Sequence, residues 1–382
     1  MLILATRGSC AIKRPAESSG DILWRWHEED TEICSPVVSS DVSEIVLVRK
    51  RHLPDGHEAE SIPDGQLREL LSRIDSDERY YDPQIVIVGP DRAPHVVDWG
   101  WSPALSRDDQ LIAYAAQTAP ISRYRVLAET LSGNEIRVHD RRLGSTSTVA
   151  KPDSGYLSDP LFSPDDQYLV YSMGSAVNGA FGGNVGIARV ALNSLAVEVL
   201  VPPSKDFGLF HLVDPKRFVS DRLLTVRCAP AASGYYIADE YACELLDTGP
   251  PLSTVYSWGR HGASSRRSFD FAQGPGAQLY VHDQDWRAVG SQQQAPPSSR
   301  EGAGRDPGVP SPDGRLVASF DKSILIIRDL SNVERQRRTL EGKIQAVTWS
   351  PDSRSIAVVL SHYRDQEERF AFDELVVLRA SS

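Results

Sequence analysis

Short apolar runs, separated by clusters of Ser, Pro, Asp and Gly, recur along almost the whole chain. The clearest examples cover residues 161–171, 310–318 and 347–358, where an apolar segment leads into Ser-Pro-Asp and a second apolar segment follows. Runs of about four to eight residues bounded by such clusters are typical of strands joined by tight turns. The pattern therefore predicts a series of β-hairpins.

The Ser-Pro-Asp segments have the chemistry of a tight turn. Pro presets φ for the first corner, Asp can accept hydrogen bonds from backbone N–H groups just beyond it, and Gly or a small polar residue tolerates a left-handed corner. The three clear copies are Ser163–Asp165, Ser311–Asp313 and Ser350–Asp352. The Asp of each copy is accordingly predicted to be structural.

Weaker copies extend this repeat over the rest of the chain. They lie at Ser35–Asp41, Trp101–Asp108 and Phe218–Asp221, and the most decayed one lies at Val255–His261. One residue of each copy serves as an anchor: Asp41, Asp108, Asp165, Asp221, His261, Asp313 and Asp352. The shortest intervals match the roughly 40–45 residues of a four-stranded blade. One hairpin cannot bury its faces, whereas blades stacked around an axis can. We therefore expect an all-β fold, a single β-propeller domain of about seven four-stranded blades over residues 1–382.

The Ser-Pro-Asp-Gly hairpin resembles the repeat of TolB-like, WD-repeat-like β-propellers, best at Trp349–Asp352 and Ser311–Gly314. The resemblance covers nearly the whole chain, but the motif specifies a turn and not a chemistry. It implies a propeller that binds peptides or proteins, or one that gates access to a hydrolase domain.

The ends of the chain are predicted to close the ring. The last blade runs out of chain after a third strand at Glu374–Leu378, which would leave an unpaired edge. The segment Ile22–Trp26 alternates like a strand, with Ile22, Trp24 and Trp26 expected on one face. We expect it to pair with Glu374–Leu378 as the outer strand of blade seven, with Leu2–Ala5 as the alternative.

Two insertions are expected between the strands. Leu67, Leu70, Leu71 and Ile74 recur at helical spacing after Asp64, which predicts a short helix over about 64–76. The stretch 290–308 is rich in Gln, Pro, Ser and Gly, which indicates a flexible loop between blades five and six.

The longest insertions join the second and third strands of their blades, so that they should emerge on one face. Three of them carry Arg and Tyr together, and these residue types are enriched at interface hot spots. The predicted binding residues are Arg79, Tyr80, Tyr81, Arg123, Tyr124, Arg125, His362, Tyr363 and Arg364.

Composition and charge narrow the possible partners. A net charge of −11 argues against a protein held to nucleic acid by phosphate contacts. The sequence lacks a run of about 20 apolar residues that could span a membrane, and Met1–Arg7 is too short for a signal peptide, so a cytoplasmic location is expected. The four cysteines lack zinc-site spacing and are expected to be free thiols, with Cys228 and Cys243 on neighbouring strands of one blade.

Motifs for catalysis or cofactors are missing from the sequence. It contains no Gly-x-Ser-x-Gly elbow, no His-Glu-x-x-His and no phosphate-binding Gly loop, and no cofactor or metal is expected. The acidic clusters Asp75–Glu78 and Asp283–Asp285 do not continue into a full set of calcium ligands. The favoured hypothesis is a non-catalytic scaffold, not an enzyme, that binds a protein or peptide and neither nucleic acid nor a membrane. Two alternatives stay open: a propeller enzyme of the lyase or lactonase type, and a small-ligand or metal sensor acting at the mouth of the central channel.

Overall fold

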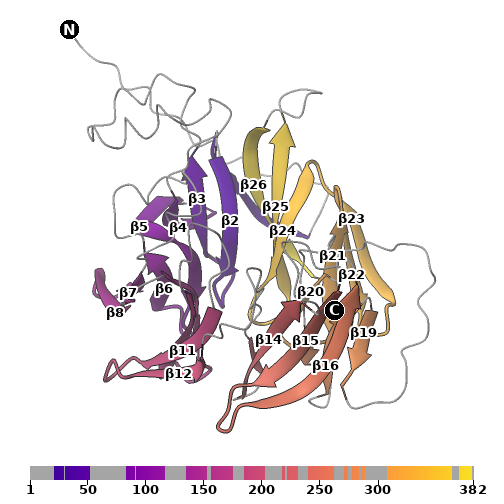
Figure 1. The fold of residues 1–382 in the computed structure, drawn as a ribbon. Coiled ribbons are helices and arrows are strands. Elements are labelled where there is room, and N and C mark those ends of the chain that lie inside the picture. The colour runs from indigo at the N-terminus through magenta and orange to yellow at the C-terminus, as the bar shows by residue number, and fades with distance from the viewer. Residues whose placement is uncertain are drawn as a thin grey trace, which may run out of the picture.

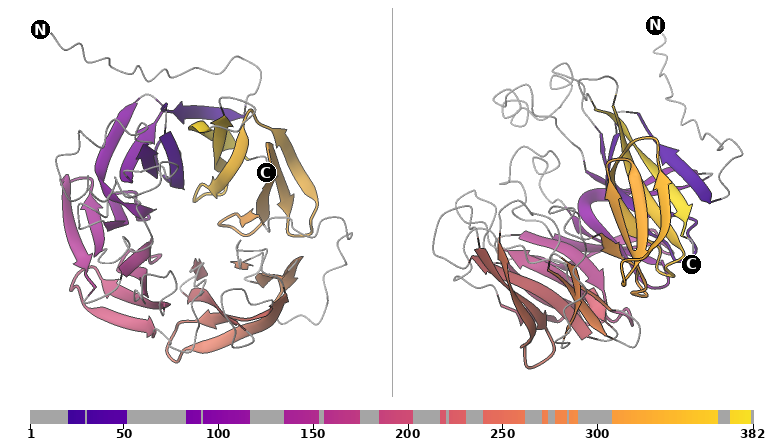
Figure 2. Two further views of the ribbon diagram at one scale, coloured as in Figure 1. Left: turned by 45° about the horizontal axis from the view of Figure 1, so that its top comes forward. Right: turned by 90° about the vertical axis from the view of Figure 1, so that its right-hand side faces the viewer.

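In the computed structural model the chain forms a ring of small β-sheets (Figures 1 and 2). The described residues are 21–29, 31–51, 83–90, 92–116, 135–152, 156–174, 185–202, 217–219, 222–230, 240–261, 271–273, 278–283, 285–289, 308–363 and 370–380. Every regular element within these ranges is a β-strand.

The strands follow the chain around the ring, blade after blade. Blade one contains β2 (Thr31–Val38), β3 (Ile45–Arg51), β4 (Gln84–Gly89) and the first half of β5 (Arg92–Leu105). Blade two contains the second half of β5, β6 (Leu111–Ala116), β7 (Glu135–Asp140) and β8 (Ser145–Ala150). Blade three contains β9 (Tyr156–Phe162), β10 (Tyr168–Gly174), β11 (Val185–Ala191) and β12 (Val197–Val201).

The other four blades complete the ring. Blade four contains β13 (Arg217–Val219), β14 (Arg222–Pro230), β15 (Glu240–Asp247) and β16 (Ser253–His261). Blade five contains β17 (Phe271–Gln273), β18 (Leu279–Asp283) and β19 (Asp285–Ala288). Blade six contains β20 (Val309–Pro310), β21 (Leu316–Asp321), β22 (Ile324–Asp329) and β23 (Glu334–Thr339). Blade seven contains β24 (Lys343–Trp349), β25 (Ser355–Tyr363), β26 (Phe370–Arg379) and β1 (Ile22–His27).

These sheets confirm the predicted all-β propeller. Neighbouring strands in each blade are antiparallel, and β5 is long enough to serve as the outer strand of blade one and the innermost strand of blade two. Seven blades are represented among the described residues, which is the number predicted from the sequence.

The hydrophobic core lies between the blades. One cluster joins blade seven to blade one through Trp26, Leu47 and Val377, and another joins blade one to blade two through Val48 and Tyr114. A strand in this position is covered on both faces, which is why continuous apolar runs, such as those of β3 and β25, are buried along their length.

The Ser-x-Asp turns join the first and second strands of blades one, two, three, six and seven. In blade seven, Ser350 Oγ donates to Asp352 Oδ1 (2.6 Å) and accepts from the Ser355 N–H (2.9 Å). The Arg354 N–H donates to the same carboxylate (3.0 Å). The same three bonds recur in the turns that begin at Ser39, Ser106, Ser163 and Ser311. The predicted structural role of the turn Asp is therefore confirmed.

The fourth residue of each of these five turns adopts a left-handed conformation, and three of the five residues contact the neighbouring blade through their side chains. These residues have φ between 55° and 67°, and they are Val42, Asp109, Asp166, Gly314 and Ser353. In three pairs of neighbouring blades the side chain of this residue accepts a hydrogen bond from a backbone N–H of the preceding turn: Asp109 from Ser40 (2.8 Å), Asp166 from Arg107 (3.1 Å) and Ser353 from Asp313 (3.0 Å).

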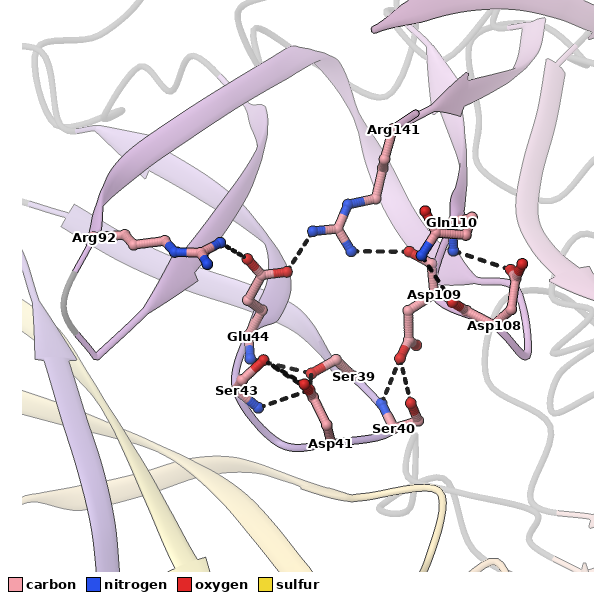
Figure 3. Close-up of polar contacts among 10 residues, drawn as sticks. All are labelled: Ser39, Ser40, Asp41, Ser43, Glu44, Arg92, Asp108, Asp109, Gln110 and Arg141. Carbon is pink, nitrogen blue, oxygen red and sulfur yellow. Dashed lines mark hydrogen bonds and ion pairs between the residues drawn. The ribbon is translucent and has the colours of Figure 1, made fainter. Parts of the chain in front are cut away.

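Figure 3 shows how this link is reinforced between blades one and two. Glu44 forms ion pairs with both Arg92 of blade one and Arg141 of blade two. Arg141 also donates to the backbone carbonyl of Asp109 (2.8 Å). We call this side of the ring the turn face.

In two of the weaker motif copies, the sequence pattern placed the start of the turn too early in the chain. The Ser35-Pro36 and Ser102-Pro103 steps do not form the turns; they lie inside β2 and β5, four residues before the turn serines Ser39 and Ser106. At both steps the strand register shifts, and Ser35 and Ser102 have φ of 47° and 49°. These are β-bulges in the innermost strands of their blades.

The boundary between blades four and five also differs from the prediction. The segment Val255–His261 was expected to open blade five, but it belongs to β16, the outer strand of blade four. It lacks the Ser-x-Asp turn, and its apolar character comes from its pairing with β15. Cys243 lies on β15, and its direct partner in register is Cys228 of β14. The expectation that the two cysteines occupy neighbouring strands of one blade is therefore confirmed.

The predicted closure of the ring is confirmed. β1 pairs antiparallel with β26, with Trp26 opposite Leu375 and Trp24 opposite Val377. A register shift between Ile22 and Trp24 turns Ile22 towards blade six, whereas both tryptophans pack against blade one. The expectation that all three share one face is therefore wrong at Ile22, because of this bulge.

Three further predictions fall outside the described residues: the helix over 64–76, the Leu2–Ala5 alternative strand, and the loop over 290–308 except for Gly308. Within the described ranges, no helix has the length and apolarity needed to cross a membrane.

Candidate functional site at the junction of blades seven, one and two

Buried polar side chains gather on the face opposite the turns, which we call the loop face. The second strands of blades one, two, three and seven end on this face, at Arg51, Ala116, Gly174 and Tyr363. The buried polar residues near the loop-face ends of strands are Thr31, Arg49, Lys50, Gln84, Glu135, Ser172, Ser361, Asp373 and Glu374. Ser172 belongs to blade three, whereas all the charged members belong to blades seven, one and two, so the charged group is not repeated elsewhere among the described residues.

Two of the nine predicted binding residues lie within the described chain. His362 and Tyr363 occupy the loop-face end of β25, beside this buried group. The ring of Tyr363 lies 5.9 Å from Lys343 Nζ. The other seven predicted residues, Arg79, Tyr80, Tyr81, Arg123, Tyr124, Arg125 and Arg364, lie outside the described residues, so their shared face stays a prediction.

His362 is held by a carboxylate and an aromatic ring. Its Nε2 lies 3.1 Å from Glu374 Oε2, and its ring stacks on Phe372 with centroids 4.7 Å apart. Arg25 of the closing strand donates to Glu374 Oε1 (3.0 Å). Burial acts to raise the pKa of Glu374, but the hydrogen bonds from His362 and Arg25 outweigh it and hold that pKa below its usual range. Glu374 is thus an ionised carboxylate that positions the imidazole.

Gly342 makes room for this imidazole at the start of β24. Its φ is +139°, a conformation that other residues rarely adopt. A Cβ at this position would lie 3.1 Å from Leu360 Cβ and 3.2 Å from His362 Cε1. A side chain there would therefore disturb the position of His362.

Asp373 is the neighbour of Glu374 in the chain, and its carboxylate points to the other face of blade seven. Its side chain accepts a hydrogen bond from Ser361 Oγ (2.5 Å) and another from the Ile33 N–H of blade one (2.8 Å). Burial is the main cause that raises the pKa of Asp373 to about 6, and the two hydrogen bonds oppose it. Asp373 thus joins blade seven directly to blade one.

Between blades one and two lies a second buried charge, Lys50. Its Nζ donates to Glu32 Oε1 (2.8 Å) and lies 5.2 Å from the centre of the Trp101 ring. The Cys34 thiol donates to the same Glu32 oxygen (3.3 Å). Burial raises the pKa of Cys34 to about 12, so this thiol stays protonated and is a poor nucleophile.

These groups do not form a hydrolytic relay among themselves. A Ser-His-acid relay requires a serine hydroxyl bonded to an imidazole, whereas Ser361 donates to the Asp373 carboxylate and His362 pairs with Glu374. Among the described residues, no group of three or more His, Cys, Asp or Glu side chains could hold a metal ion. What this cluster offers to a ligand is charge and hydrogen bonding at a fixed place on the loop face.

Sequence reasoning missed most of this cluster, although a signal was present. Apolar strands in blades seven, one and two carry polar or charged residues at their loop-face ends, as in Arg49 and Lys50 after Ile45–Val48, and in Asp373 and Glu374 before Leu375–Leu378. Polar residues at the end of a fully buried strand must find partners or a function.

Comparison with known proteins shows similarity in fold. Neither a family model nor a curated protein sequence matches the chain. Its structure is similar to the β-propeller domain of the Trilobed protease from Pyrococcus furiosus, with a TM-score of 0.52, 11% identity, and coverage of 90% of this chain and 93% of that one. It is also similar to an acylaminoacyl peptidase in complex with Z-Gly-Gly-Phe-chloromethyl ketone, with the same TM-score and identity, over 92% of this chain and 51% of that one.

A third similar structure is the acylaminoacyl peptidase of Pyrococcus horikoshii, at a TM-score of 0.52 and 11% identity, over 90% of this chain and 50% of that one. The chain therefore spans about half the length of these acylaminoacyl peptidases. At this identity the similarities show the fold, which is that of a β-propeller.

The comparisons also correct the functional prediction. The hypothesis of a non-catalytic scaffold that is not an enzyme is wrong, because the solved propellers similar to this one are parts of peptidases, which favours the alternative of an enzyme propeller. The missing nucleophile elbow does not decide the question, because about half of each acylaminoacyl peptidase chain lies outside the matched region.

Proposed function

We propose that the protein is the propeller of a peptidase-type enzyme and that its loop face contacts the peptide substrate. The observation that carries the proposal is the group of buried charged side chains in blades seven, one and two, which among the described residues lies on the loop face and is not a feature of the repeat. The fold similarity to propellers of two kinds of peptidase supports the reaction class.

The chemistry of the cluster suits a peptide. A peptide presents N–H groups, carbonyl groups and charged termini, and the loop face offers the His362 imidazole, the cation of Lys343 and the Tyr363 ring close together. Tyr and Arg side chains at such places often dominate binding energy. The peptide partner expected from the sequence fits this proposal as a substrate.

Four narrower statements belong to the same proposal. The five Ser-x-Asp turns support membership in the TolB-like, WD-repeat-like group of propellers. A single propeller domain over residues 1–382 and a cytoplasmic location stay predictions, as does the lack of nucleic-acid and membrane partners.

Hydrolysis assays with matched variants test the proposal. The protein is isolated from its own source, so that any catalytic part that accompanies the propeller is present, and it is given peptides with free or acetylated N-termini. Tyr363→Ala on the loop face should raise KM about five- to thirtyfold, as expected for a contact worth ~1–2 kcal/mol.

The matched control is Tyr168→Ala. Tyr168 also packs against a cation, with Arg189 4.7 Å from its ring, but it lies at the turn-face end of β10. This variant should keep the KM of the unmodified protein. If the isolated protein neither hydrolyses nor binds any of the peptides, the proposed function is wrong.

A further inference from the structure

The seam between blades seven and one is the place where the two ends of the chain are joined. β1 closes blade seven through its pairing with β26, and the two tryptophans of β1 pack against blade one. On the loop face, Asp373 of β26 bridges the same seam, since it accepts hydrogen bonds from Ser361 of blade seven and from the Ile33 N–H of blade one.

Asp373 is buried with neutral partners. It is 2% exposed, and its hydrogen-bond donors are a hydroxyl and a backbone N–H. The next residue, Glu374, is also buried, but its partners are Arg25 and His362. A buried carboxylate whose partners are neutral favours the protonated form, whereas one with cationic partners favours the ionised form.

The charged groups around Asp373 do not offset its burial. Glu32 on β2 raises the pKa of Asp373, and this glutamate is itself paired with Lys50. His362 on β25 lowers the same pKa but pairs with Glu374. On the neighbouring strands β3 and β1, the nearby cations are engaged elsewhere: Arg49 by Glu28, and Arg25 by Glu374.

We propose that this seam is a proton-controlled latch: Asp373 takes up a proton as blade seven docks on blade one, and mild acid therefore holds the ring closed more tightly than neutral solution does. The geometry accommodates the proton. The protonated oxygen donates to Ser361 Oγ, and the other oxygen still accepts the Ile33 N–H, so neither hydrogen bond is lost. When the seam opens, Asp373 meets water and releases the proton.

The expected size follows from linkage. With a pKa of about 6 in the closed seam and an ordinary value of 3.8 in the open one, the equilibrium constant for opening should rise about tenfold from pH 5 to pH 8. Native-state hydrogen exchange measures this constant. The protection factors of the backbone amides of residues 31–34, corrected for the intrinsic pH dependence of exchange, should fall about tenfold from pH 5 to pH 8. The protection factors of residues 185–191 in blade three should not change over this range.

Three variants of the full chain separate the latch from general stability. Asp373→Asn keeps both hydrogen bonds without a charge and should show high, pH-independent protection at the seam. Glu374→Gln removes the negative charge that pairs with Arg25 and His362, and it should weaken the seam equally at each pH while keeping the tenfold change in the opening constant. Ser361→Ala removes a hydrogen bond that favours the ionised form, so that the response should move to higher pH.

The results that overturn the latch are equally specific. The latch is contradicted if the corrected protection factors of residues 31–34 in the unmodified protein do not change between pH 5 and pH 8. It is also contradicted if these protection factors depend on pH in Asp373→Asn as strongly as in the unmodified protein. If Asp373→Asn does not fold, an unchanged pH response in Ser361→Ala takes over as the contradicting outcome.

Discussion

The two faces of this propeller solve the same problem, the joining of neighbouring blades, in different ways. On the turn face, blades are linked by a repeated set of hydrogen bonds between Ser-x-Asp turns, in which the buried polar groups are mainly serine hydroxyls. On the loop face, blades seven, one and two are linked by buried charges that occur once, such as Lys50, Asp373 and Glu374.

The difference separates what the repeat needs from what this protein adds to it. A serine hydroxyl and an exposed carboxylate can be placed in every turn at little cost, because both keep their hydrogen bonds locally. A buried charge is costly unless it is paired, so a cluster confined to three blades indicates a role that the fold alone does not require. That contrast supports the proposal that the loop face contacts the substrate, whereas the turns on the other face contribute to stability.

The largest expected effect comes from removal of the closing strand. Deletion of residues 1–27 removes β1 and with it two buried tryptophans, each worth about 3–5 kcal/mol when truncated to Ala. The whole ring should then melt at lower temperature, in one cooperative step, as followed by calorimetry. Deletion of residues 1–20 is the control and should leave the melting temperature unchanged, since the closing strand begins at Ile22. A 1–27 deletion that melts like the full chain would show that the ring closes in another way.

A single turn serine should matter less, but still measurably. Ser350→Ala leaves the buried Ser355 N–H without its acceptor and Asp352 without one of its two donors. The free energy of unfolding, measured with urea, should fall by about 1–3 kcal/mol. Ser145→Ala, at an exposed position of β8, should stay within about 0.5 kcal/mol. If both variants lose the same free energy of unfolding, the hydrogen bonds of the turn do not contribute to stability as predicted.

The smallest expected effect is the acid response of the turns, which is opposite in sign to that of the seam. Hydrogen bonds from the Ser163 hydroxyl and the Gln167 N–H lower the pKa of Asp165. Its stabilisation is therefore fully present above the unfolded pKa of ~3.9 and is lost below it, as the pH falls through the lowered pKa of the folded protein. In urea unfolding between pH 5 and pH 3, Asp165→Asn should lose less stability than the unmodified protein, whereas Glu341→Gln should lose as much. A steeper acid loss in Asp165→Asn would contradict the assignment.

The sequence was informative where the structure is local. The Ser-x-Asp turns could be predicted because their hydrogen bonds join residues within five positions of each other, as from Ser350 to Asp352 and Ser355. The closing strand could be predicted from its alternation and from the unpaired edge at Glu374–Leu378. The boundary between blades four and five was misread because Val255–His261 was taken for a decayed motif copy, whereas this segment is part of β16 and pairs with β15.

The site was much less predictable, for a physical reason. Asp373 and Ile33 are 340 positions apart, and they meet because the ring closes. Lys50 is likewise buried against Trp101 of the next blade, which no local pattern indicates. His362 and Tyr363 were predicted because an insertion between two strands carries Arg and Tyr together, although both residues lie on β25. Their partners Glu374 and Lys343 were not predicted.

The most direct test of the central claim is a photo-crosslinking map of a bound peptide. A peptide that carries a photoreactive group is incubated with the protein from its own source, and the attached residues are identified by mass spectrometry. We expect the photoreactive peptide to attach on the loop face near Lys343, His362 and Tyr363, and we expect unlabelled peptide to reduce this attachment. Attachment that competes but falls at the turns, around Ser40, Asp109 and Asp166, would contradict the division of the molecule into a functional and a structural face.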